Sequence, residues 1–188
     1  MSLATPIAEC QAEVHGRWLD RVMASYPEQA RPFFRRQKNR FANPVGQTLD
    51  RGLRLLLQEL AGESRPEELC RHLEEILRVR SVQSFTPAQA VRFLFELKDI
   101  VREVLGERLA DRREQEWLGR FDRQVDQLAL FAFDIYSRLR ERMYQLRIAE
   151  VKRSVSTIMK RTGYFSEELF AKPVPEQKTA GPSGAPGE

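Results

Sequence analysis

The chain has 188 residues, a formal net charge of +4, 41% hydrophobic residues and 31% charged residues. This length suits one domain that buries a core without disulfides or metals, and the composition is too apolar for general disorder. Cys10 and Cys70 belong to no CxxC pair, and the first residues lack the basic segment of a secretory signal. No apolar run approaches the ~20 residues that cross a bilayer. We therefore expect a soluble, cytoplasmic protein with reduced thiols.

The first part of the chain predicts two helices. Apolar residues at helical spacing indicate an amphipathic helix over residues 6–25, capped by Thr5. Asn43 and Pro44 indicate the start of a second helix, because Asn caps and Pro is tolerated in the first turn. Gly62 is expected to end it. Between these helices we expect one short helix and turns, with the phenylalanine rings of this segment packed inward.

Two more helices follow in the middle of the chain. Ser64 to Glu67 matches a capping box, and the helix that it opens is expected to turn Leu69, Leu73, Ile76 and Leu77 inward before breaking within residues 80–85. Thr86 and Pro87 then begin a helix that runs to about residue 105 and is apolar nearly all round. Such a helix is typical of the centre of a core. Gly106 is expected to end it.

Residues 111–160 are expected to form one long last helix, because this stretch contains no Pro and a single glycine, Gly119. Apolar residues step along it by threes and fours, which is typical of a coiled coil. The candidate residues for a dimer or partner interface are Phe121, Val125, Leu128, Ile135, Leu139, Tyr144, Arg147 and Lys152. A wider apolar face, Leu130, Phe131, Phe133 and Tyr136, is expected to pack on the domain. We thus expect a helical domain over residues 1–163, then a short turn and a disordered tail over 164–188.

No residue pattern indicates catalysis. His15 and His72 lie on separate predicted helices and have no second ligand at metal-binding spacing. No serine occupies a nucleophile elbow, and no glycine-rich loop cradles phosphate. The many carboxylates alternate with Arg and Lys in a way that is typical of solvated helix faces. We therefore predict no catalytic residue, no metal and no cofactor.

Two other features leave alternatives open. Residues 138–161 carry about six net positive charges. This charge would bind nucleic acid or an anionic membrane, or it would flank a coiled coil that docks an acidic partner. We favour the coiled-coil reading, because no helix-turn-helix or aromatic platform accompanies the charge. The second feature is a set of aromatic residues that either line a pocket for a small apolar ligand or belong to the core. The pocket candidates are Trp18, Tyr26, Phe34, Phe41 and Phe93.

Several segments together resemble the amino-terminal domain of the RsbRD-type stressosome regulators. The resemblance is carried by Trp18 to Pro27, Phe41 to Gly46, Arg78 to Gln83, Phe85 to Val91, Phe93 to Lys98 and Tyr144 to Lys152. It covers roughly residues 5–160. The resemblance implies a globin-like helical domain without haem, a dimer, and a sensory role in which the last helix leads into a STAS domain.

The sequence departs from that pattern after Phe170, and we expect no STAS domain to follow. We therefore expect an all-α, globin-like helical bundle that stands alone and acts as a non-enzymatic sensor or adaptor. It is expected to form a homodimer and to bind a regulatory protein. The alternatives are a nucleic-acid or membrane-surface binding protein that uses the basic helix end, and a haem-binding globin sensor.

Overall fold

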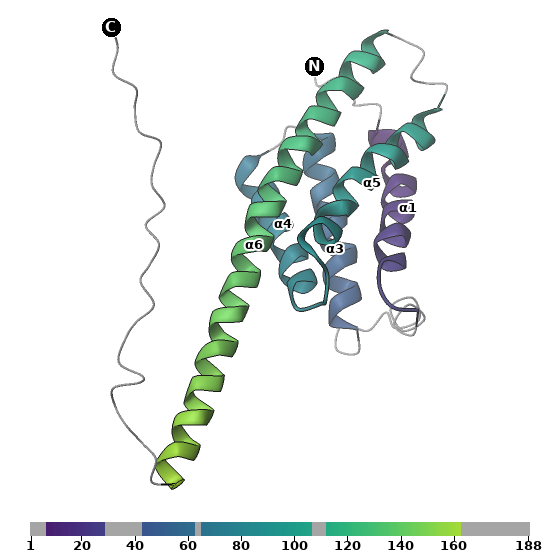
Figure 1. Cartoon of the computed structure of the whole chain (residues 1–188). Coiled ribbons are helices and arrows are strands. Elements are labelled where there is room, and N and C mark those ends of the chain that lie inside the picture. The colour runs from purple at the N-terminus through teal and green to yellow at the C-terminus, as the bar shows by residue number, and fades with distance from the viewer. Residues whose placement is uncertain (1–6, 29–42, 63–64, 107–111, 163–188) are drawn as a thin grey trace, which may run out of the picture. The chain divides into compact units, whose positions relative to one another are not determined.

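The computed structural model of the chain describes residues 7–28, 43–62, 65–106 and 112–162 (Figure 1). These residues form the 3-10 helix η1 (Ala8–Cys10) and the α-helices α1 (Gln11–Ala24), α3 (Pro44–Ala61), α4 (Pro66–Ser81), α5 (Pro87–Leu105) and α6 (Arg112–Thr162). No strand occurs among them. The predicted fold class, an all-α globin-like bundle with a long carboxyl-terminal helix, is confirmed. The chain divides into two compact units, Met1–Tyr144 and Gln145–Glu188, with the boundary inside α6.

Local signals begin and end α3 and α5 as the sequence predicts. The Asn43 side chain accepts a hydrogen bond from the Gly46 backbone N–H at 2.8 Å. Thr86 and Gln89 form a reciprocal capping box at the start of α5. At the other end of α5, Gly106 has a φ of 44°, in the region that glycine adopts at little cost. The short-range chemistry at these ends is sufficient to place them.

The start of α4 differs from the prediction. Arg65, not Ser64, is the cap residue, and its side chain makes no capping hydrogen bond. The Glu59 carboxylate from the preceding helix accepts a hydrogen bond from the Arg65 backbone N–H at 3.1 Å and pairs with its guanidinium at 2.8 Å. The predicted capping box is therefore wrong, because a side chain outside the pattern satisfies the free N–H. The predicted cap Thr5, the segment with Phe33 and the tail lie outside the described residues.

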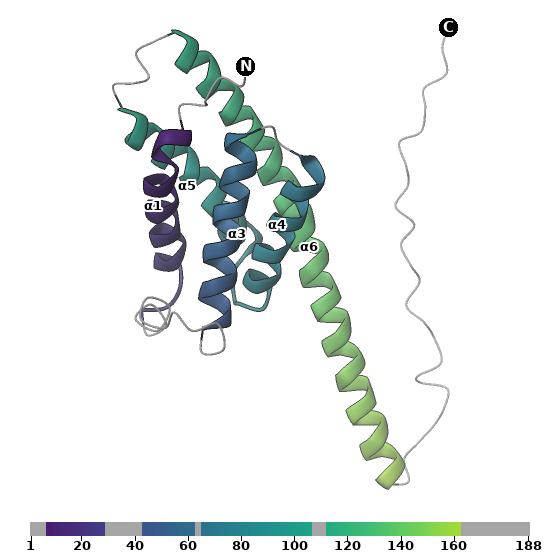
Figure 2. The ribbon, with the colours of Figure 1, turned by 180° about the vertical axis from the view of Figure 1, so that it is seen from behind.

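Four helices of the first unit pack around one core. Figure 2 shows α1, α3 and α4 side by side with α3 in the middle, and α5 contacts both α1 and α4. Gly52 on α3 lies so close to α4 that an added Cβ would stand 2.7 Å from Ile76 Cγ1. The fully buried side chains include Val14, Leu49, Leu53, Leu56, Leu73, Leu77, Leu94, Leu97 and Ile100. The predicted central helix α5 buries eight of its 19 residues, and Phe95 is exposed.

The first part of α6 belongs to the same core. Its buried side chains are Phe121, Val125, Leu128, Ala129, Ala132 and Tyr136. The Tyr136 hydroxyl donates a hydrogen bond to the Phe85 carbonyl oxygen at 2.7 Å. Lys98 on α5 pairs with Asp126 at 2.8 Å, and Arg102 pairs with Asp122. These polar contacts join α6 to α5 and to the turn before α5.

Candidate partner-binding surface

The aromatic residues of the predicted ligand pocket are core residues where the structure describes them. Trp18, Tyr26 and Phe93 are buried, whereas Phe34 and Phe41 lie outside the described residues. The Trp18 indole N–H donates a hydrogen bond to the Phe93 carbonyl oxygen at 2.7 Å, and the two rings stack with centroids 5.9 Å apart. Ligand binding by this set stays a prediction.

A buried arginine occupies the space between these rings. Arg80, at the end of α4, is only 1% exposed. Its guanidinium carbon lies 4.4 Å from the ring centroid of Phe85 and 5.6 Å from those of Tyr26 and Phe93. Burial lowers the pKa of the guanidinium, and the nearby Tyr26 and Glu96 oppose this shift. The aromatic cluster thus holds a cation that the chain itself supplies.

Backbone oxygens complete the surroundings of Arg80. Its Nε donates to the Ala90 carbonyl at 3.0 Å and its Nη2 to the Gln89 carbonyl at 3.1 Å. A weaker contact of 3.4 Å joins Nη1 to the Ser25 hydroxyl. The sequence contained one signal for this role, because position 80 continues the buried stripe of α4 through Ile76. We therefore assign Arg80 to the organisation of the core between α1, α4 and α5.

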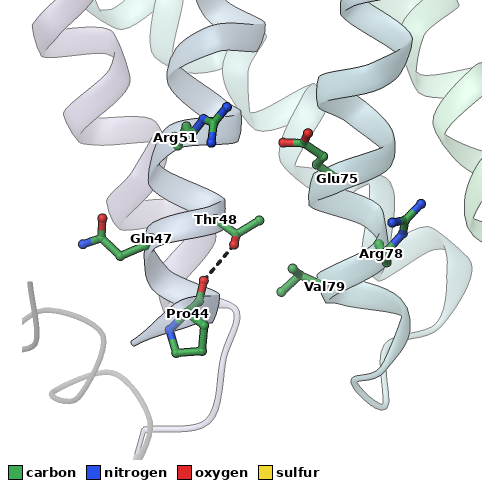
Figure 3. Close-up of a pocket in the computed structure, with 7 residues that line it drawn as sticks. All are labelled: Pro44, Gln47, Thr48, Arg51, Glu75, Arg78 and Val79. Atoms are coloured by element: carbon green, nitrogen blue, oxygen red, sulfur yellow. Dashed lines mark hydrogen bonds between the residues drawn. The ribbon is translucent and has the colours of Figure 1, made fainter. Parts of the chain in front are cut away.

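An open groove of about 840 Å³ lies between α3 and α4. Figure 3 shows its lining residues, Pro44, Gln47, Thr48, Arg51, Glu75, Arg78 and Val79. The Thr48 hydroxyl donates to the Pro44 carbonyl oxygen of its own helix at 2.8 Å. The remaining polar groups are two guanidiniums, one carboxylate and one amide. This set contains no pairing of a nucleophile with a base, and we assign it no reaction.

The histidines are engaged by neighbouring groups. His15 Nε2 lies 3.1 Å from the Asp50 carbonyl oxygen and 3.3 Å from its carboxylate. His72 is buried, with Nε2 3.6 Å from the Glu68 carboxylate. Within the described ranges, no three His, Cys, Asp or Glu side chains gather in a way that would hold a metal ion.

The predicted interface residues separate into two groups. Phe121, Val125 and Leu128 belong to the core of the first unit, and Ile135 and Leu139 are half-buried against it. The interface prediction is wrong for the three core residues, because the chain itself covers them. The spacing by threes and fours was correct, but it marks the face of α6 that packs on α5 rather than a seam between chains.

The exposed residues of the predicted interface lie near the unit boundary and beyond it. Tyr144, Arg147 and Lys152 are exposed. The Tyr144 hydroxyl accepts a hydrogen bond from Arg140 at 2.6 Å. Arg140 also donates to the Ser81 carbonyl oxygen at 3.1 Å. Tyr144 is therefore connected to the turn after α4 through one arginine.

An exposed apolar surface lies on α6 within the first unit. Leu130 is 72% exposed, Phe131 58% and Phe133 47%. The expectation that these three residues pack on the domain is wrong, although Tyr136 does so. An α-helix turns about 100° per residue, so Leu130 lies almost opposite the buried Leu128 and Ala132. Phe131 and Phe133 flank Leu130 on either side, so the three side chains spread over about half of the helix circumference. We call Leu130, Phe131 and Phe133 the outer face of α6.

The part of α6 that belongs to the second unit also exposes apolar side chains. Ile148, Val151, Val155 and Ile158 are all exposed and follow one another at intervals of three, four and three residues. We call these four residues the distal seam. Leu146 is exposed as well but does not share this spacing. Although α6 is long, none of the described helices is apolar enough over a sufficient length to cross a membrane.

Within the described residues, the chain is thus a helical bundle whose last helix exposes apolar side chains on two segments. Residues 12–151 match the family described as "RsbT co-antagonist protein rsbRD N-terminal domain". This match covers most of the chain, which therefore belongs to that family. The chain is also 26% identical over 157 residues to an uncharacterized protein of Archaeoglobus fulgidus, covering 82% of this chain and 93% of the archaeal protein. No solved structure is significantly similar to the chain.

Proposed function

We propose that this chain is a non-enzymatic, cytoplasmic signalling adaptor that forms a homodimer and binds a regulatory protein through its last helix. One observation carries this proposal, the exposure of Leu130 on the side of α6 opposite the core, with the exposed Phe131 and Phe133 flanking it on either side. Clustered exposed apolar side chains are characteristic of protein interfaces, and aromatic residues contribute much of the binding energy there. Membership of the RsbRD amino-terminal family supports a signalling role of the stressosome type.

The outer face suits a second copy of the chain. Its three large side chains are uncharged and lie within four consecutive residues of one helix, so a two-fold axis beside it would bring like surfaces together. Fully burying a Leu or Phe side chain contributes about 1.5 to 3 kcal/mol. Two copies of this face would therefore contribute enough to offset much of the cost of association.

Sedimentation equilibrium of the full chain at micromolar concentration tests the dimer. The wild type is expected to show twice the 21.9 kDa chain mass. The double change Phe131→Glu with Phe133→Glu is expected to raise the dissociation constant by on the order of 100-fold, because two charges would be buried at the interface. Circular dichroism of the variant is expected to match the wild type, since both side chains are exposed.

Val82→Glu is the matched control, because Val82 is an exposed apolar residue in the turn after α4. It introduces the same kind of charge outside the outer face and is expected to leave the dimer intact. A wild-type monomer, or a double variant that dimerises as tightly as the wild type, would contradict the proposal.

A further inference from the structure

The distal seam has the spacing of a coiled coil. Taking Ile148 and Val155 as a positions places Val151 and Ile158 at d positions, and each side chain is between 41% and 60% exposed. All four residues are β-branched, a type that coiled coils use at a positions. The seam is narrow, as in a helix that meets one partner helix rather than a broad surface. Residues 148–158 span about one and a half heptads, roughly 15 Å at a rise of 1.5 Å per residue.

The charged residues beside this seam are all basic. In the same register Arg147 and Arg161 occupy g positions and Lys152 an e position. Among the described residues, Arg147 and Lys152 have no ion-pair partner. Residues 145–162 contain five Lys or Arg and a single acidic residue, Glu150, which lies away from the seam at a c position. The flanks of the seam therefore carry only positive charge.

This charge pattern disfavours a second copy as the occupant of the distal seam. In a parallel pair of identical helices, the g residue Arg147 of one chain would face the e residue Lys152 of the other. An antiparallel pair would also bring basic flank residues together, since no acidic residue lies on either flank. Like charges across a coiled coil select against that pairing and favour an oppositely charged helix.

We propose that the distal seam binds an amphipathic helix of a protein partner whose own apolar seam is flanked by Glu and Asp. This inference rests on the proposed function and names the chemistry of the partner that the last helix binds. Acidic side chains at the partner's e and g positions would pair with Arg147 and Lys152, while its a and d residues cover the seam. Membrane-surface helices instead carry Trp, Phe and Leu on the apolar face, and the distal seam contains only Val and Ile.

Binding of three labelled synthetic peptides to the full chain, measured by fluorescence anisotropy, tests this proposal. The first peptide has Ile and Leu at a and d and Glu at e and g. The second replaces Glu by Lys at those flanks, and the third keeps the Glu flanks but has Ser at a and d. Only the first is expected to bind, and its affinity is expected to fall with added salt. Equal binding of the first and third peptides would overturn the proposal, because it would show attraction to negative charge alone.

Two sets of variants assign the binding to the seam and its flanks. The double variant Arg147→Glu with Lys152→Glu is expected to bind the Glu peptide at least about tenfold more weakly than the wild type does. The same variant is expected to bind the Lys peptide instead. Ile148→Ser with Val155→Ser is expected to abolish binding of the Glu peptide. Leu146→Ser is the matched control, since Leu146 is exposed on the same segment but lies off the seam. Equal losses in Leu146→Ser and the seam variant would overturn the assignment.

The same samples separate this inference from the proposed dimer. The Ile148 and Val155 changes are expected to leave the sedimentation mass unchanged, because the dimer is assigned to the outer face. If the Glu peptide fails to bind at ~100 μM while the chain remains a dimer, the inference about the partner is wrong and the dimer stands. If the Glu peptide binds a monomeric chain, the dimer is wrong and the partner's chemistry stands. Binding of the chain to phosphatidylserine vesicles without binding of the Glu peptide would replace the protein partner by a membrane.

Discussion

The same substitution at two helical glycines is expected to change stability in opposite directions. Glycine inside a helix costs about 1 kcal/mol relative to alanine, so Ala is favoured wherever it fits. Gly16 on α1 has nothing within 4 Å of an added Cβ, and Gly16→Ala should stabilise the fold by about 0.5 to 1 kcal/mol. At Gly52 the added Cβ would stand 2.7 Å from Ile76 Cγ1. Ile76 is fully buried, and overpacking a core costs about 1 to 3 kcal/mol.

The net result for Gly52→Ala is a loss of about 1 kcal/mol, which separates the two variants by roughly 2 kcal/mol. Urea denaturation followed by circular dichroism measures this difference as a shift of the midpoint at an unchanged slope. Gly16→Ala serves as the control for helix propensity, because it makes no new contact. If Gly52→Ala stabilises the chain as much as Gly16→Ala does, the close approach of α3 and α4 at this position is refuted.

Three further measurements test two residues of the core and the cap of α5. Trp18→Phe should lower the free energy of unfolding by about 2 kcal/mol, because the hydrogen bond to the Phe93 carbonyl oxygen is lost and a small cavity forms. Trp117→Phe, at a half-buried position, should lower it by less than half as much. Equal losses of stability in urea titrations of the two variants would contradict this. Burial raises the pKa of Tyr26, so the folded state keeps a proton that the unfolded chain loses, and stability should fall as pH rises above about 10. Tyr26→Phe should reduce that alkaline loss, and an unchanged pH profile would argue against it. Thr86→Ala should cost about 1 kcal/mol and speed amide exchange in the first turn of α5, because its hydroxyl caps the helix.

Much of the helical architecture was predictable because its signals are local. Asn43 with Pro44 and Thr86 with Pro87 each place a capping side chain within three residues of the N–H that it satisfies. Such contacts form whatever the rest of the chain does. The start of α4 was mispredicted for the opposite reason, since Glu59 of the preceding helix satisfies the Arg65 N–H.

The interior of the core needed the tertiary structure. Residue type does not distinguish Arg80 from the exposed Arg78, because both are basic residues at the end of α4, and only the position of Arg80 on the buried stripe separates them. The guanidinium of Arg80 is surrounded by the rings of Phe85 and Phe93, which follow it in the sequence, and of Tyr26, which precedes it by 54 residues. Of the aromatic residues predicted to line a ligand pocket, Trp18, Tyr26 and Phe93 do lie close together. The space between the rings of Tyr26 and Phe93 holds Arg80 of the same chain.

The sequence by itself determined that the chain is helical, that its last helix is long, and that this helix carries more apolar residues than one face can hold. Periodicity identifies such faces without ranking them, because the stripe through Phe121 and the stripe through Leu130 are both apolar. The tertiary structure decided between them. Packing of α6 against the core buries Phe121 and leaves Leu130 facing outward, and Lys98 with Asp126 and Tyr136 with Phe85 add polar contacts to this packing. The surface available to a partner is therefore a product of packing between distant segments.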